Sequence, residues 1–255
     1  MIKALLFFLL LTASTTIGQT PNAASKRFLF DFRTEKRNSP PKIAPSLQKT
    51  LLTQIFRRYL TDDSRCKSDF GASGNDYLSA ARNAGQFVPS ILGFAFGSFT
   101  AAGKTEFAYL ISVGECNASH ADNYGSKRLA IFAGQDLIAN FDINFNSSIL
   151  RKTDLNGDGI NELLLSTGDM AQGTLIETAT LYSFENGKAA VIEDFGQVTE
   201  DSCASGMPGS EAKAVALEIG VAGPGKMPKF KKDNYVSPCR NVKRWRFVSS
   251  GKLDQ

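Results

Sequence analysis

The sequence predicts a mainly β (α+β) protein of antiparallel sheets, with one N-terminal amphipathic helix packed on them. Two observations support this fold class. Seven short apolar or alternating runs follow one another between residues 91 and 195, separated by Gly-rich or Asn/Asp-rich breaks. Earlier in the chain, apolar residues recur every four positions after Ser46, which is the period of a helix. The 255 residues are enough for one good core or two small ones.

The N-terminus has the pattern of a secretory signal peptide over residues 1–18. Lys3 precedes an apolar run over Ala4–Leu11, and small and hydroxylated residues continue to Gly18. The run is about half of the roughly 20 residues that span a bilayer, which disfavours the alternative of a retained membrane anchor. We expect a mature chain that begins near Gln19, has no transmembrane segment, and is secreted or periplasmic.

Residues 19–45 contain Pro and mixed charge with little apolar sequence, which predicts a flexible arm; only the Phe-rich stretch near Phe28 suggests an edge strand. Residues 46–90 are expected to form a helical cap. Ser46 is the candidate N-cap, and Leu47, Leu51, Ile55 and Tyr59 lie on one face of a helix of about four turns. A docked helix is favoured over a membrane-surface or partner helix. A second, shorter helix is expected over 76–84.

The β region is expected over residues 91–198. Asn186 and Gly187 between two runs predict a hairpin, because both residues tolerate positive φ. A last segment, 199–255, is basic and Gly-rich, with two further strands. The predicted strands are Ile91–Phe99, Phe107–Val113, Leu129–Phe132, Leu137–Phe141, Leu163–Thr167, Thr178–Phe184, Ala189–Phe195, Ala214–Ile219 and Arg244–Ser249.

Charge is strongly segregated along the chain. Residues 97–201 carry 6 basic and 15 acidic side chains, whereas residues 223–255 carry 9 basic and 2 acidic ones. The acidic middle concentrates cations. The basic C-terminal segment either contacts a polyanion weakly or only offsets the negative charge of the middle. The candidate polyanion contacts are Lys226, Lys229, Lys231, Lys232, Arg240, Lys243, Arg244 and Arg246.

Four cysteines follow the signal peptide, namely Cys66, Cys116, Cys203 and Cys239. An even number in an exported chain predicts two disulfides, and three pairings are open. Nearest-neighbour pairing, Cys66 with Cys116 and Cys203 with Cys239, is preferred. No CxxC pair is present, which argues against zinc and redox sites.

The segment Asp154–Glu162 has the pattern of a calcium loop. Asp154, Asn156, Asp158 and Glu162 supply oxygens at its positions 1, 3, 5 and 9, and the carbonyl of Ile160 is the expected ligand at position 7. The EF-hand alternative fails because position 12 is Leu165, inside an apolar strand-like run. A metal-free turn is disfavoured by the mutual repulsion of three acidic groups. Magnesium is disfavoured because it requires near-octahedral geometry.

This loop resembles the DxNxDGxxDL loop of FG-GAP and VCBS repeats, the units of integrin-α-like β-propellers; Glu162 stands where Asp is commoner. The resemblance implies that Asp154, Asn156, Asp158 and Glu162 bind calcium in a hairpin loop. A degenerate copy lies 56 positions earlier, where Gly103 and Glu106 match Gly159 and Glu162. Ser98, Thr100 and Ala102 replace the inner ligands there, so calcium binding is expected to be lost.

The resemblance covers residues 94–196 and implies two blade-like sheets, too few for a closed propeller. Capping of these sheets by the N-terminal helix and the C-terminal segment is favoured over assembly of several chains.

The favoured function is a secreted, calcium-binding, non-enzymatic module for recognition or adhesion, with an extracellular or cell-surface ligand. The alternative is a cell-envelope or extracellular hydrolase, or its accessory domain, with calcium in a structural role. No catalytic residue is assigned: the single histidine, His120, lies in a polar run, and no nucleophile or metalloprotease motif occurs. Specific nucleic-acid binding is not expected.

Overall fold

The computed structural model describes residues 26–36, 42, 44, 46, 54–55, 90–112, 127–143, 146–223, 225–240 and 243–252. The predicted signal peptide, the helix over 76–84, His120, Cys66 and Cys116 lie outside these residues. The helix expected from Ser46 lies almost wholly outside them and stays a prediction. Within that range Ile55 is fully buried, and Gln54 donates to the carbonyl of Gln135 at 2.8 Å.

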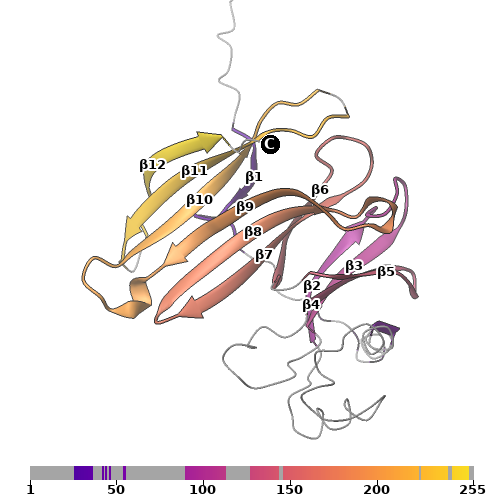
Figure 1. Cartoon of the computed structure of the whole chain (residues 1–255), viewed down its shortest axis with the longest axis horizontal. Coiled ribbons are helices and arrows are strands. Elements are labelled where there is room, and N and C mark those ends of the chain that lie inside the picture. The colour runs from indigo at the N-terminus through magenta and orange to yellow at the C-terminus, as the bar shows by residue number, and fades with distance from the viewer. Residues whose placement is uncertain are drawn as a thin grey trace, which may run out of the picture.

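The described residues form a mainly β, antiparallel fold, as predicted (Figure 1). The strands are β1 (Phe28–Asp31), β2 (Ser90–Gly97), β3 (Glu106–Ser112), β4 (Lys127–Ala133), β5 (Asp136–Asp142), β6 (Ser148–Thr153), β7 (Glu162–Ala171), β8 (Thr174–Ser183), β9 (Ala190–Asp201), β10 (Glu211–Ile219), β11 (Phe230–Pro238) and β12 (Arg246–Lys252). Two short 3₁₀ turns, η2 (Glu185–Gly187) and η3 (Cys203–Ser205), lie between them. None of the helices in the described part has the length and apolar character that crossing a membrane requires.

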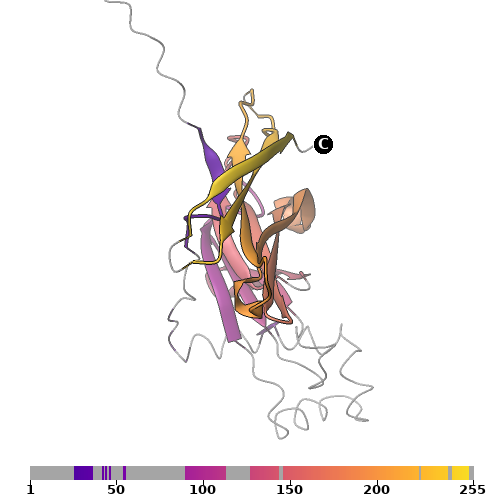
Figure 2. The same ribbon diagram turned by 90° about the vertical axis from the view of Figure 1, so that its left-hand side faces the viewer.

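Two sheets contain these strands. The smaller has the order β2-β3-β4-β5, and the larger has the order β12-β11-β10-β9-β8-β7-β6, with β1 paired to β10. The larger sheet curls, and Figures 1 and 2 place the smaller sheet beside its β6 and β7 end. Strands β2–β5 and β6–β9 are therefore two consecutive four-stranded meanders, each beginning with a hairpin that encloses one of the two predicted loops.

The apolar run Leu163-Leu164-Leu165 in β7 is buried because both faces of this strand are covered. Leu163 and Leu165 belong to a core shared with the smaller sheet, together with Phe99, Leu110 and Ile131. Leu164 faces the opposite core, inside the curled sheet. Successive side chains of a strand point to opposite faces, so one uninterrupted apolar run serves two cores.

The C-terminal segment differs from the expectation that it caps the blades. Strands β10–β12 continue the larger sheet instead, and the expected boundary at 198/199 falls inside β9. Strands β9 and β10 pair over only three residues, after which β10 pairs with β1. The Lys232 ammonium bridges this separation, donating to the carbonyls of Phe195 and Gln197 at 2.8 and 2.6 Å. The edge strand β9 has backbone N–H and C=O groups that can pair with a further strand. The C-terminal segment therefore joins the larger sheet through backbone hydrogen bonds.

Candidate functional site

The predicted calcium loop connects β6 to β7 as a hairpin loop over residues 154–161. Gly157 and Gly159 have φ of +76° and +83°. An L side chain at either position would be strained, which is why the turn needs glycine there. The loop therefore has the tight hairpin context that its glycine pattern predicts.

Nested side-chain turns shape the loop. Asp154 accepts the N–H of Gly157 through Oδ1 at 2.7 Å and that of Gly159 through Oδ2 at 3.0 Å. Asn156 Oδ1 accepts the N–H of Asp158 at 3.1 Å, and Asp158 Oδ1 accepts that of Ile160 at 2.7 Å. The amide of Asn156 also donates to Asp158 Oδ2 at 2.7 Å. The three inner positions of the motif thus gather their oxygens along one short turn.

Glu162 lies beneath this turn and is 2% exposed. Its Oε2 accepts the N–H of Leu155 at 2.9 Å, and the backbone N–H of Glu162 itself also favours the charged carboxylate. Burial raises the pKa of Glu162 to about 7, with smaller contributions from the Asp158 and Asp154 carboxylates. Negative charge at the base of the loop is therefore only partly compensated by the described protein groups.

The degenerate copy is a hairpin loop of the same length, residues 98–105 between β2 and β3. Glu106 is also 2% exposed and accepts the N–H of Phe99 at 2.6 Å, which is the same seven-residue bond that Glu162 makes to Leu155. Here, however, Thr100 also donates its N–H at 2.8 Å to Oε2 and its hydroxyl to Oε1. Both oxygens of Glu106 thus have donors that include a side-chain hydroxyl, whereas the donors to Glu162 are backbone N–H groups alone.

The two loops contact each other. The amide oxygen of Asn161 accepts the N–H of Ser98 at 3.0 Å, and the N–H of Asn161 donates to the Ser98 carbonyl at 2.6 Å. The N–H of Asn186 donates to the Thr100 carbonyl at 2.8 Å. The hairpin that Asn186 and Gly187 predict thus closes against the first loop, so the two meanders meet loop to loop.

Calcium requires oxygen ligands, and each predicted ligand offers one. Carboxylate and amide oxygens keep a second lone pair when they accept one hydrogen bond. Within the described residues, however, no three His, Cys, Asp and Glu side chains converge as a ready-made metal cluster. The residue types of the loop are those that calcium prefers. To bind an ion, the Asn156 amide and the Asp158 and Glu162 carboxylates would have to turn toward it.

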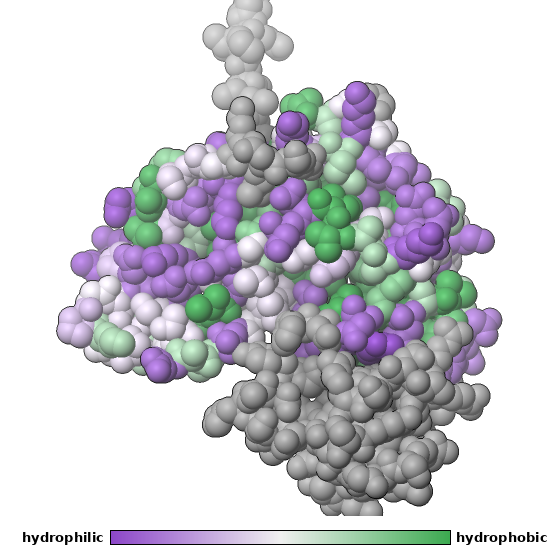
Figure 3. Space-filling view, viewed as in Figure 1, coloured by the Kyte–Doolittle hydropathy of each residue, from purple (hydrophilic) through white to green (hydrophobic). Residues whose placement is uncertain are grey.

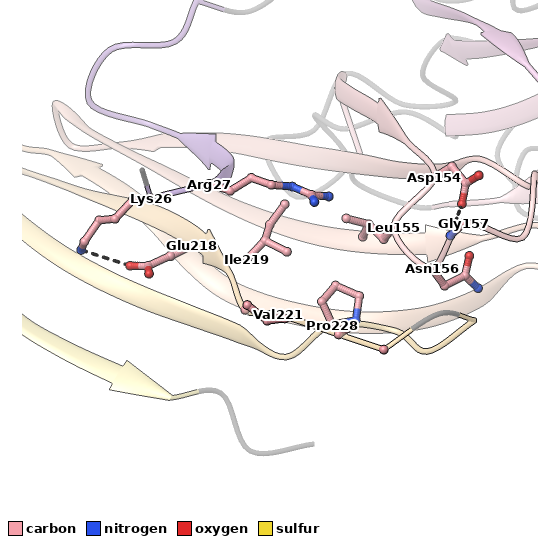
Figure 4. Close-up of a pocket in the computed structure, with 13 residues that line it drawn as sticks. Lys26, Arg27, Asp154, Leu155, Asn156, Gly157, Glu218, Ile219, Val221 and Pro228 are labelled. Carbon is pink, nitrogen blue, oxygen red and sulfur yellow. Dashed lines mark hydrogen bonds and ion pairs between the residues drawn. The ribbon is translucent and has the colours of Figure 1, made fainter. Parts of the chain in front are cut away.

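A pocket of about 570 Å³, missed by the sequence reasoning, adjoins this loop (Figure 4). One wall is Asp154–Gly157, and the opposite walls are the chain before β1 and the connection from β10 to β11. The N–H of Gly225 donates to the Asn156 carbonyl at 3.0 Å, which ties that connection to the calcium loop. Lys26 and Arg27 carry no motif and lie over 120 positions before the loop, so only folding brings them here.

The remaining predicted residues are placed as follows. Cys203 and Cys239 form a disulfide with a Cα–Cα distance of 5.3 Å. The basic C-terminal cations do not form one free surface: Lys231 pairs with Asp233 at 3.1 Å, and Lys243 pairs with Asp201. The Lys232 ammonium donates to two carbonyls of β9 where β9 and β10 separate, and burial lowers the pKa of Lys232.

Comparison with family models, with curated proteins and with solved structures finds no match to this chain.

Proposed function

We propose that the Asp154–Glu162 loop binds calcium through the side chains of Asp154, Asn156, Asp158 and Glu162 and the carbonyl of Ile160. The observation that carries the proposal is the contrast between the two loops. Glu106 accepts two backbone N–H groups and the Thr100 hydroxyl, whereas Glu162 accepts only backbone N–H groups, those of Leu155 and of Glu162 itself, and lies near two further carboxylates. A divalent cation supplies the missing positive charge in the second loop, and the first loop needs none.

The proposed role is that of a secreted or periplasmic, FG-GAP/VCBS-like, non-enzymatic module for recognition or adhesion. Support comes from the two four-stranded meanders, which begin with hairpin loops of equal length and carry a buried glutamate at the same position. The Cys203–Cys239 disulfide supports an oxidising compartment. In this role calcium rigidifies a loop that both meanders contact, and the adjoining surface binds the ligand.

Calcium titration followed by thermal unfolding tests the proposal. At ten times the dissociation constant, bound calcium stabilises the folded state by about 1.4 kcal/mol. For a chain of this size that raises Tm by about 3–6 °C. Asp158→Ala and Asp158→Asn are both expected to abolish the rise; the Asn variant keeps an acceptor for the Ile160 N–H and therefore the turn.

Asp169→Asn in β7 is the matched control, because Asp169 is exposed and lies outside the loop. It should show the wild-type rise, and magnesium at the same concentration should give a smaller one. A wild-type melting curve unchanged by millimolar calcium would remove the metal assignment.

A further inference from the structure

The pocket beside the calcium loop contains one cation, Arg27, that no described residue neutralises. The chain enters β1 through Lys26 and Arg27, whose side chains point in opposite directions (Figure 4). Lys26 pairs with Glu218 and Asp233, each at 3.1 Å. Arg27 reaches over the pocket instead, and its guanidinium forms no hydrogen bond or ion pair with any described residue.

The backbone holds Arg27 in place although its side chain is free. Its carbonyl accepts the N–H of Ile219 at 2.8 Å, which extends the pairing of β1 with β10. A guanidinium on a fixed backbone keeps five donors available in a planar fork that suits carboxylate and phosphate oxygens.

The acidic residues of the pocket are already occupied. Glu218 pairs with Lys26 and with Lys231. Asp154 accepts two backbone N–H groups of its own loop. The connection between β10 and β11 adds Lys226 and Lys229, which have no acidic partner in the described part of the chain. Arg27, Lys226 and Lys229 are therefore the side chains of this region whose charge remains available to an anion.

The rest of the lining is apolar or backbone. Leu155, Ile219 and Pro228 lie around the space below Arg27 (Figure 4), and Gly220 and Gly223 also line the pocket. A volume of about 570 Å³ lies within the roughly 300–1,000 Å³ of small-molecule sites, which combine apolar walls with a few placed polar groups. On the face in Figure 3, hydrophobic residues occur in small groups among hydrophilic ones, so that face offers no broad apolar surface as a competing site.

We propose that this pocket binds a small anionic ligand, with its charged head on Arg27 and a compact aliphatic body against Leu155, Ile219 and Pro228. Arg27, which would hold the anion, is not one of the proposed calcium ligands. The anion site therefore goes beyond the calcium proposal and does not depend on it.

The test is an NMR titration of the full mature chain, following the amide signals of Gly220 and Gly223. The probes are 4-methylpentanoate, its neutral match 4-methylpentanamide, and 3-methylbutyl phosphate. We expect saturable shifts for the carboxylate or the phosphate at millimolar concentration and at least tenfold weaker binding of the amide. Whichever anion binds more tightly identifies the head group. Arg27→Gln should weaken binding of the anions about tenfold, because it removes a charge-assisted pair.

Lys188→Gln is the matched control, since Lys188 is an exposed cation in the β8–β9 connection, away from the pocket lining. It should bind the anions as the wild type does. Each titration is run once with EDTA and once with calcium. Anion binding is therefore measured whether or not the loop binds calcium, and the two proposals can fail separately. Equal binding of carboxylate, phosphate and amide, unchanged binding by Arg27→Gln, or no saturable shift in either buffer overturns the proposal.

Discussion

Glu106 and Glu162 begin equivalent strands and make the same backbone hydrogen bond, yet their surroundings differ. In the first loop Thr100 stands at the position of Asn156, and its N–H and hydroxyl complete the solvation of Glu106. In the second loop the Asn156 amide donates to Asp158, and the donors to Glu162 are backbone N–H groups alone. A buried carboxylate is tolerated when hydrogen bonds or a cation compensate its charge, or when it is protonated. Thr100 therefore supplies to Glu106 a hydroxyl donor that Asn156 does not supply to Glu162.

We predict that Glu106 stabilises the fold by accepting backbone hydrogen bonds of its own loop. Glu106→Ala leaves the N–H groups of Phe99 and Thr100 without their acceptor in a buried site. Each unsatisfied buried group costs about 1–3 kcal/mol, so we expect a loss of about 2–4 kcal/mol in unfolding free energy, measured by urea denaturation. Glu106→Gln keeps an acceptor oxygen and should lose less.

Glu185→Ala, at an exposed position in η2, controls for loss of a carboxylate in the same region. It should change the unfolding free energy by less than about 0.5 kcal/mol. If Glu106→Ala were as stable as this control, the proposed solvation of the carboxylate would be wrong.

At the scale of elements, the two hairpins interlock through a glycine and an asparagine. A Cβ added at Gly97 in β2 would lie 2.3 Å from Oδ1 of Asn161. The same oxygen accepts the Ser98 N–H at 3.0 Å. The close approach of β2 to the calcium loop therefore requires the absence of a side chain at residue 97, although its φ is not positive.

Gly97→Ala should displace the Asn161 side chain and break its bond to Ser98, at a cost of about 1–2 kcal/mol. Chemical denaturation measures this loss. Gly168→Ala in β7 is the matched control, because its added Cβ would meet nothing closer than 3.9 Å. In the Asn161→Ala background, Gly97→Ala should lower the unfolding free energy by less than it does in the wild type. A double-mutant cycle in which the two losses simply add would contradict the contact.

At the scale of the whole molecule, Asp233 in β11 joins segments from both ends of the described chain. It is 1% exposed, and it accepts hydrogen bonds from Lys26 before β1 at 3.1 Å and from Ser250 in β12 at 2.5 Å. Burial would raise the pKa of Asp233, but the hydrogen bonds from Ser250, Lys26 and Lys231 outweigh it and hold that pKa below its ordinary value.

A depressed carboxyl pKa gives a definite sign for the pH dependence of stability. Asp233 contributes stability above its unfolded pKa of about 3.9, and the contribution is lost as the pH falls through the lower folded value. Asp233→Asn should therefore reduce the unfolding free energy at pH 7 by about 1–3 kcal/mol and much less near pH 3. Urea unfolding at both pH values measures the difference.

Asp136→Asn, at the exposed first residue of β5, should have little effect at either pH. An Asp233→Asn loss of equal size at pH 7 and pH 3 would show that ionisation of Asp233 does not contribute.

The strands that the sequence predicted are those with apolar or β-branched runs. Leu163–Thr167 and Ala214–Ile219 lie inside β7 and β10. Two strands were missed. The β11 sequence begins Phe230-Lys-Lys-Asp-Asn, which has low β propensity. Strand β6 is short, and Arg151 and Lys152 interrupt its apolar sequence. Both form because neighbouring strands supply hydrogen-bonding partners and, for Asp233, ion pairs.

The sequence by itself determined the local features: the loop glycines, the oxygen-bearing side chains at alternate positions, the copy 56 residues earlier and the hairpin at Asn186. These depend on residues close together in the chain, where backbone sterics and local hydrogen bonds dominate. Only the tertiary structure decided that Cys203 pairs with Cys239, which the sequence preferred among the open pairings, that β1 joins β10 and that Arg27 faces the Asp154–Glu162 loop. These contacts join residues between 36 and about 190 positions apart, so no local pattern in the sequence specifies them.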